Sequence, residues 1–336
     1  MKNSLFLLGA AAVVALSSCT KNEVLEVAEN RAIGFDNAFV NNGTRSIVDP
    51  SLTNDSLQNF DVYGFVTNTS GNSSKIFGGD DVTKDVTKED GNWNYTNTQY
   101  WIKGNTYTFG ALAPANAATV SGEAITGETN KKVGMTVEFT NDGNTDLLHA
   151  APNAVTVGTD NYNTAVAMVF NHQLSKVKFS FTNSVGVGYS VKVKDVKITN
   201  AKKTGTLTVA GEQNAANTWG SQAGTLELDF GHVVADDAES NEAVSIANAE
   251  TKETYNEKLM IPTSEGTSYT VTFTAELYQA GILVGTYLRS VTISNQKLEL
   301  GYCYDFTAEL NAKNIVDPTN PLTPIKFTAT MNETWK

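Results

Sequence analysis

The chain is short of cysteine, histidine and arginine, and each shortage excludes a class of protein. Its 336 residues contain two cysteines and three widely separated histidines, which leaves no zinc-finger spacing, disulfide framework or haem-attachment motif. Three of its 24 basic residues are arginines, against 36 acidic residues, and the formal charge is −12. This charge disfavours a phosphate backbone, so nucleic acid is excluded as a partner. Hydrophobic residues make up 40% of the chain, enough for a buried core.

The longest hydrophobic run lies at the N-terminus and is too short to remain in a membrane as a helix. Leu5 to Leu16 is an uncharged run of twelve residues after Lys2, whereas a spanning helix needs about 20. Residues 1–18 are therefore expected to be a signal peptide. The run ends in Leu16-Ser-Ser-Cys19, which resembles the bacterial lipobox. That resemblance implies that Cys19 carries diacylglycerol and an amide-linked acyl chain such as palmitate, which anchors the chain in the outer membrane.

The alternative for Cys19 is an ordinary secretory signal with an incidental cysteine. If Cys19 is lipidated, Cys303 remains without a disulfide partner and is expected to be a small apolar residue in the interior. Residues 19–31 are polar and acidic, and are expected to form a tether between the lipid and the folded body.

From Phe60 onward, apolar and polar residues alternate with a period of two, and turn residues interrupt the runs every eight to fifteen positions. The pattern predicts an all-β chain whose sheets each bury one face. Lys176-Val-Lys-Phe-Ser-Phe181 is a clear example. A loop near Pro152 to Asn163 predicts a boundary between an N-terminal domain at 32–155 and a C-terminal domain at 156–317.

Several motifs, in a fixed order, are similar to those of the Bacteroidales fimbrillin family, the subunits of type V pili. They are Phe60-Asp-Val-Tyr-Gly-Phe65, Asp146-Leu-Leu-His-Ala150, Phe170-Asn-His-Gln-Leu-Ser-Lys-Val-Lys-Phe-Ser-Phe181 and Leu298-Glu-Leu-Gly-Tyr-Cys-Tyr-Asp-Phe306. With the lipobox, the resemblance covers nearly the whole chain. It implies two transthyretin-like β-sandwich domains in tandem, export as a lipoprotein, and removal of a first strand by cleavage after an arginine. It also implies polymerisation by strand exchange into a fimbrium on the cell surface that contributes to adhesion.

The residues near the N-terminus are compatible with such a removable strand. Ala32 to Val40 reads as a strand with Ile33, Phe35 and Phe39 on one face. The following loop contains Gly43 and Arg45, and loops of this kind are accessible to proteases. Cleavage by a trypsin-like, arginine-specific protease is expected after Arg45 rather than Arg31, because a cut after Arg31 would leave the strand at 32–45 attached.

The C-terminal residues 318–336 predict a proline-rich spacer followed by a donor strand. Pro318, Pro321 and Pro324 are three of the seven prolines in the chain. The strand after them places four apolar residues on one face: Ile325, Phe327, Ala329 and Met331. Both terminal strands begin Ile-x-Phe, so the C-terminal strand of one subunit is expected to leave its own domain and fill the groove vacated in another. The alternative is that both are edge strands that never exchange.

Other patterns favour no further chemistry. Asp142, Asn144 and Asp146 have the spacing of a calcium loop but lack its glycine and its glutamate, so no metal or cofactor is expected. No nucleophile motif accompanies His172, which is expected to be structural, and no enzymatic activity is expected. The alternative function is a monomeric, lipid-anchored protein that binds a host or other glycan through aromatic residues: Trp93, Tyr95, Tyr100 and Trp101.

Overall fold

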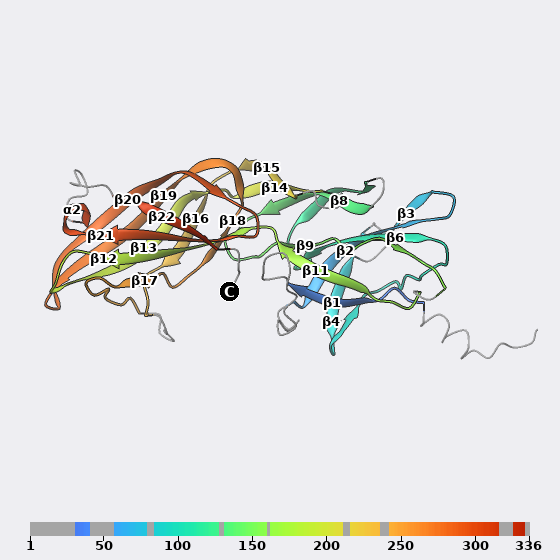
Figure 1. Ribbon diagram of the computed structural model, residues 1–336, viewed down its shortest axis with the longest axis horizontal. Coiled ribbons are helices and arrows are strands. Elements are labelled where there is room, and N and C mark those ends of the chain that lie inside the picture. The colour runs from blue at the N-terminus through green and yellow to red at the C-terminus, as the bar shows by residue number, and fades with distance from the viewer. Residues whose placement is uncertain are drawn as a thin grey trace, which may run out of the picture.

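The computed structural model describes residues 31–40, 57–78, 84–127, 131–159, 162–210, 216–235, 242–315 and 325–332. These residues form strands β1 to β22 and one short helix, α2 (Ala312–Ile315), so the all-β prediction is confirmed. None of the helical residues described could cross a membrane, because α2 is too short. The molecule is elongated, with β1 in one half and α2 at the far end of the other (Figure 1).

The N-terminal half is built on a nine-stranded sheet. Its main path runs β1-β11-β9-β6-β2-β4-β5, with β3 on β2 and β10 on β6. β1 lies at one end of this path and pairs in parallel with β11. The strands are β1 (Phe35–Val40), β2 (Asn59–Thr67), β3 (Ser73–Phe77), β4 (Asp85–Glu89), β5 (Asn92–Asn94), β6 (Thr106–Ala113), β9 (Leu148–Ala150), β10 (Val155–Thr156) and β11 (Val166–His172).

The C-terminal half is a sandwich of two sheets. The five-stranded sheet runs β17-β12-β21-β22, with β18 on β12, and the four-stranded sheet runs β16-β13-β19-β20. The first contains β12 (Ser175–Asn183), β17 (Thr251–Glu253), β18 (Lys258–Met260), β21 (Cys303–Leu310) and β22 (Phe327–Asn332). The second contains β13 (Tyr189–Ala201), β16 (Leu226–Gly231), β19 (Thr263–Gln279) and β20 (Ile282–Leu298).

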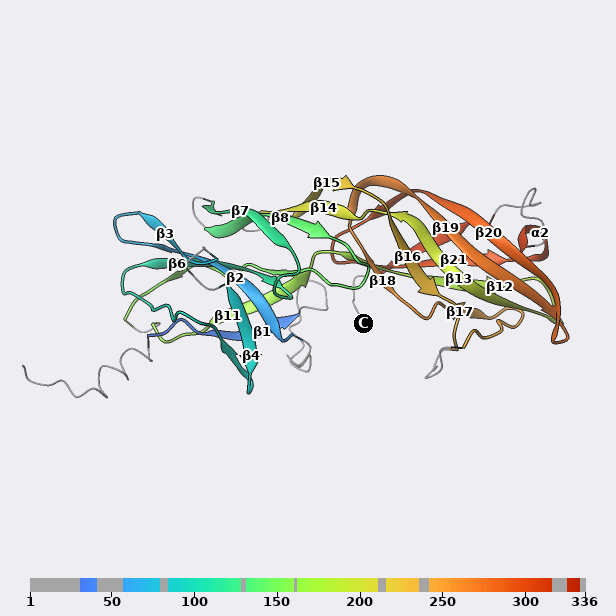
Figure 2. The same ribbon diagram turned by 180° about the vertical axis from the view of Figure 1, so that it is seen from behind.

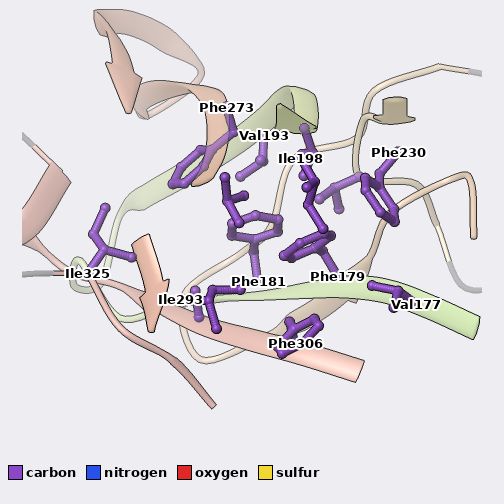
Figure 3. Packing of buried hydrophobic residues seen from close by; sticks show 14 of the residues in the cluster. Val177, Phe179, Phe181, Val193, Ile198, Phe230, Phe273, Ile293, Phe306 and Ile325 are labelled. Atoms are coloured by element: carbon purple, nitrogen blue, oxygen red, sulfur yellow. The ribbon is translucent and has the colours of Figure 1, made fainter. Parts of the chain in front are cut away.

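Period-two alternation explains the core between these two sheets. On β12, Val177, Phe179 and Phe181 are fully buried, while Lys176 and Lys178, on either side of Val177, face outward and form ion pairs. Phe273 of β19 and Phe306 of β21 meet the same cluster (Figure 3). Each strand therefore contributes one apolar face to a single core, as the alternation predicts.

A further four-stranded sheet joins the two halves. It runs β15-β14-β8-β7 and contains β7 (Thr119–Thr126), β8 (Lys132–Thr140), β14 (Thr204–Val209) and β15 (Thr218–Ala223). β8 comes from the N-terminal half and pairs with β14 from the C-terminal half, from Thr140 opposite Thr204 to Met135 opposite Val209. In Figures 1 and 2, β14 and β15 lie near the place where the two halves meet, and β8 runs from there along the N-terminal half. The halves therefore share a sheet and the apolar cluster beneath it.

The predicted boundary between residues 155 and 156 falls inside the nine-stranded sheet. β11 follows that point in the sequence, yet it pairs with β1 and β9 of the first half. The chain enters the C-terminal sandwich between His172 and Ser175, where β11 ends and β12 begins. The predicted boundary was misplaced because a polar loop that joins two strands of one sheet looks the same in sequence as a loop that joins two domains.

Candidate assembly site

The first strand lies at the edge of its sheet and is anchored by both backbone and side chains. Ile33 and Phe35 are 1% and 6% exposed. Val166 N–H donates to the Gly34 carbonyl at 2.8 Å, on the side of β11. β1 therefore has one strand neighbour in the main path of the sheet, and its departure would leave the edge of β11 open.

An aromatic pocket receives the Phe35 side chain. Its ring lies between 5.7 and 6.0 Å from those of Phe60, Phe77, Tyr95 and Phe109, and each of these contacts is edge-to-face. The Tyr95 hydroxyl also donates to the Ile33 carbonyl at 2.6 Å. Edge-to-face pairs contribute beyond the area they bury, so Phe35 is the principal side-chain anchor of β1.

The alternation along β1 is interrupted by a shift in its pairing with β11. The register changes between Asp36 and Phe39, and Ala38 is fully buried. A shift of this kind moves the inward face by one residue. The sequence predicted Ile33, Phe35 and Phe39 on one face; Ile33 and Phe35 face the core, and the side chain of Phe39 lies outside the described residues.

The C-terminal strand β22 is also an edge strand, and here it pairs with its own domain. It runs antiparallel to β21, with Phe327 opposite Ala308, Ala329 opposite Phe306 and Met331 opposite Tyr304. The sequence suggested a tail free of its own domain, whereas the structure docks it there. The reason is that β21 at the end of the sandwich offers both an open backbone edge and an apolar surface.

Two of the four predicted donor residues take part in the core of that sandwich. Ile325 is 8% exposed, at the rim of the cluster in Figure 3. The ring of Phe327 is half-buried and lies 5.3, 5.8 and 6.4 Å from those of Phe179, Phe181 and Phe273. Ala329 and Met331 are exposed. β1 and β22 are therefore alike: each lies at the edge of a sheet, and each places one phenylalanine, Phe35 or Phe327, among other aromatic rings.

The predicted processing sites differ in what the structure describes. Cys19, Arg45 and the three spacer prolines lie outside the described residues. Arg31 is exposed, but its carbonyl accepts from Trp101 N–H at 2.8 Å, and Ile33 N–H donates to the Gln99 carbonyl at 2.8 Å. These hydrogen bonds flank the Arg31–Ala32 peptide bond. A protease needs free backbone, so the fold protects the Arg31 site.

The two central motifs of the sequence meet as neighbouring strands. In the pairing of β9 with β11, Ala150 lies opposite Phe170 and His149 opposite Asn171. His172 Nδ1 lies 2.6 Å from Asp146 Oδ2, and Gln173 N–H donates to the Leu147 carbonyl at 2.9 Å. The structural role expected for His172 follows from this contact. The contacts between the two motifs hold β9 and the end of β11 together at the point where the chain enters the second half.

Comparison with known proteins agrees with these motifs. The family model described as fimbrillin-like matches residues 44–333. The chain belongs to the fimbrillin-like family. No curated protein matches it.

The solved structures that match the chain include two fimbrial proteins. A fimbrial protein from Bacteroides vulgatus is 15% identical with a TM-score of 0.62, over 91% of this chain and all of that one. The fimbrial anchor protein Mfa2 from Porphyromonas gingivalis is 13% identical with a TM-score of 0.38, over 90% of this chain and 98% of that one. The Bacteroides vulgatus structure shows that this fimbrillin-like chain has a fold already seen in a fimbrial protein.

The aromatic residues proposed as a glycan platform do not present a common surface in this fimbrillin-like chain. Trp101 is 2% exposed, and Trp93 is half-buried 5.1 Å from the ring of Phe60. Tyr95 packs against Phe35, which leaves Tyr100 as the exposed member of the set, at 45%. Stacking on sugars needs exposed ring faces. These residues instead pack in the core and around the Phe35 side chain of β1.

The calcium-like spacing forms a turn. The Asp142 carboxylate accepts from the N–H groups of Asn144 at 2.8 Å and Thr145 at 2.7 Å, and from the Thr145 hydroxyl at 2.7 Å. Burial opposes the charge, but these donors outweigh it and hold the pKa of Asp142 below its usual value. Across the described residues, no cluster of three or more histidine, cysteine or acidic side chains is suited to a metal ion.

The buried His149 on β9 is expected to make the free energy of unfolding depend on pH. Burial, followed by the charge of Lys132, lowers the pKa of His149 to about 4, and its Nδ1 lies 3.3 Å from the Asn217 side-chain amide. An unfolded histidine titrates near 6.5, so acidification protonates the unfolded chain first. The free energy of unfolding should therefore fall by about 3 kcal/mol between pH 6.5 and 4.

Urea unfolding of the wild type and His149→Gln across this pH range tests the assignment. The glutamine side chain can still accept a hydrogen bond but does not titrate. The difference in stability between the two proteins should shrink as the pH falls from 6.5 to 4. A constant difference would mean that His149 is not the group responsible.

Proposed function

We propose that the chain is a structural subunit of a surface fimbrium that contributes to adhesion. In this proposal it is exported as a lipoprotein acylated on Cys19, cleaved after Arg45 and polymerised by donor-strand exchange. The observation that carries the proposal is the pair of edge strands near the two ends of the chain, β1 and β22, each anchored by one phenylalanine among aromatic rings. A chain with this arrangement can lose β1 by cleavage and donate β22 to another subunit.

Cleavage after Arg45 would release residues 19–45, which include β1. The edge of β11 and the pocket of Phe60, Phe77, Tyr95 and Phe109 would then be open to another strand. Each large apolar side chain returned to such a pocket contributes on the order of 1.5–3 kcal/mol. Main-chain pairing with β11 adds specificity, as in donor-strand complementation. The same cut removes Cys19, and with it the lipid anchor.

The strand that enters would be β22 of another subunit, with Phe327 in the place of Phe35. To donate it, a subunit must first lift β22 from β21 and give up the contacts of Phe327 with Phe179, Phe181 and Phe273. During exchange, Phe327 therefore leaves the aromatic site in its own domain and enters the aromatic pocket of another subunit. While β1 is in place the pocket is filled, so an uncleaved subunit offers no acceptor and stays unassembled.

The partners implied are other pilin subunits, a trypsin-like arginine-specific protease and, before cleavage, the outer membrane. A host or glycan ligand would be bound by the assembled fibre on the cell surface. The role is structural, with no catalytic step and no cofactor.

Cleavage specificity tests the proposal. Brief treatment of the lipid-free subunit with a trypsin-like protease should give a new N-terminus at Ser46 and an SDS-resistant ladder. Arg45→Ala should prevent both, because β1 then stays attached. Arg31→Ala is the matched control and should prevent neither, since hydrogen bonds on both sides of its peptide bond protect that site. An equally strong ladder from Arg45→Ala, with its N-terminus before Ile33, would sink the mechanism.

A further inference from the structure

A lysine, an asparagine and a buried aspartate meet beside β2. Lys84 Nζ donates to Asn116 Oδ1 at 3.0 Å and to Asp61 Oδ2 at 3.1 Å. The backbone N–H of Asn116 donates to the same Asp61 oxygen at 2.9 Å. The side chain of Asp61 is 2% exposed, whereas that of Lys84 is 36% exposed. One amine therefore contacts both a carboxamide and a carboxyl group that is nearly inaccessible to water.

β2 holds the three residues in place. Asp61 lies on β2, which pairs with β4 and with β6. Lys84 comes just before β4, and its carbonyl accepts from Val62 N–H at 2.8 Å. In the loop after β6, Ala115 N–H donates to the Asn59 side chain at 2.8 Å. The sheet thus fixes the amine against the carboxamide, and fixed proximity of this kind accelerates a reaction between groups that rarely meet in solution.

The Asp61 carboxyl group is suited to carry protons between the other two groups. Burial raises its pKa above the usual value, and the Asp85 carboxyl opposite it acts in the same direction. The hydrogen bonds from Asn116 and Lys84 lower the pKa, but only in part. Asp61 Oδ1 is buried and has no hydrogen-bond partner among the described residues. A carboxyl group that favours its protonated form can take a proton from the Lys84 ammonium and leave a neutral amine beside the carboxamide.

We propose that the amine of Lys84 and the side-chain amide of Asn116 join in an intramolecular amide bond, with Asp61 as the proton carrier. The lysine nitrogen attacks Cγ of Asn116, a C–N bond forms, and the bond from Cγ to Nδ2 breaks. Asp61 takes, one after the other, the two protons that the lysine nitrogen loses, and passes them to the departing nitrogen. That nitrogen leaves as ammonium, so the step needs no oxidant, reductant or further reactant.

The bond links the start of β4 to the loop after β6, across β2. Both of its residues come after Arg45, so the link stays in the chain if β1 is removed as proposed above. A cross-link between segments that are distant in sequence restricts the unfolded chain and so stabilises the fold. The bond would therefore compensate the nine-stranded sheet for contacts that it loses with β1.

A second lysine and asparagine provide an internal control. Lys132 Nζ donates to Asn153 Oδ1 at 3.0 Å, the same distance, and Lys132 is 8% exposed. In the part of the chain that the structure describes, its other hydrogen bond goes to the Ala151 carbonyl at 2.6 Å, and no carboxyl group contacts it. Because this pair has no proton carrier, it should remain unlinked.

Mass spectrometry of the purified, lipid-free, uncleaved chain tests the proposal. Its intact mass should fall short of the mass of its sequence by about 17 Da, one ammonia, because the amide bond replaces the Asn116 nitrogen. Trypsin digestion should give a branched peptide that joins Lys84 to Asn116. Asp61→Asn keeps the shape of the side chain but cannot carry protons, so it should lower the yield of this peptide at least tenfold. Lys84→Arg should abolish it.

An unmodified mass in the wild type, with no branched peptide, would overturn the proposal whatever the variants do. So would a loss of ammonia that persists in Lys84→Arg, because an asparagine can also lose ammonia by closing on its own backbone. A peptide that joins Lys84 to Asp61 with loss of water, or one that joins Lys132 to Asn153 in equal yield, would contradict the assigned roles. The bond needs neither cleavage nor strand exchange, so its absence would leave the ladder after Arg45 cleavage unaffected.

Discussion

Replacing Phe35 with alanine is expected to lower the free energy of unfolding of the uncleaved chain by about 3–5 kcal/mol. The side chain is 6% exposed and meets four aromatic rings edge-to-face, so its removal leaves a cavity that those rings can only partly fill. Phe35→Leu keeps most of the volume and should cost less than about 1.5 kcal/mol. Urea unfolding of the uncleaved chain measures both.

The same pair of proteins also tests whether β1 is dispensable after processing. Cleavage after Arg45 removes residue 35, so the wild type and Phe35→Ala yield an identical chain beginning at Ser46. Their difference in stability should disappear on cleavage, and both should form ladders equally well. Equal stability before cleavage would mean that Phe35 is not the anchor of β1. A difference that persists after cleavage would mean that β1 remains in place.

Phe327→Asp is expected to abolish the SDS-resistant ladder. In the acceptor pocket a carboxylate would be surrounded by aromatic rings with no partner for its charge, which costs several kcal/mol. The uncleaved monomer should also lose about 2–3 kcal/mol, because the half-buried ring packs on three phenylalanines of its own domain. The loss in the free energy of unfolding should not exceed this amount, because β22 can detach while the rest of the sandwich stays folded.

Thr328→Asp is the matched control for this experiment. It adds the same charge one residue along β22, on an exposed position that faces away from the core. It should form a ladder and unfold within about 0.5 kcal/mol of the wild type. A Phe327→Asp protein that polymerises as well as the wild type would show that Phe327 does not enter the pocket. Equal failure of both variants would assign the effect to charge alone.

Local patterns were sufficient to predict the strands. Alternation in the Lys176 to Phe181 segment predicted the inward face of β12, and the sequence placed Ile33 and Phe35 on one apolar face, which is buried in the structure. These features depend on neighbouring residues, whose side chains point to opposite faces of a strand. The aromatic character of the site was not predicted, because Phe60, Phe77 and Phe109 come from three different strands.

Features that depend on distant pairing could not be predicted in the same way. No residue of β8 indicates that its partner strand is β14, whose paired residues lie 64 to 74 positions later in the chain. The register shift in β1 and the docking of β22 on β21 likewise depend on the neighbouring strand. The motifs at Asp146 and Phe170 were both recognised, but their pairing becomes clear only when β9 and β11 lie side by side.

The central claim is that the chain loses β1 and the residues before it when it joins a fibre. Sequencing the N-terminus of the form assembled on the cell surface tests this most directly. The account predicts that the assembled chain begins at Ser46. An assembled chain that begins at the acylated Cys19, or at any residue before Ile33, would contradict it, because β1 would then still occupy the pocket around Phe35.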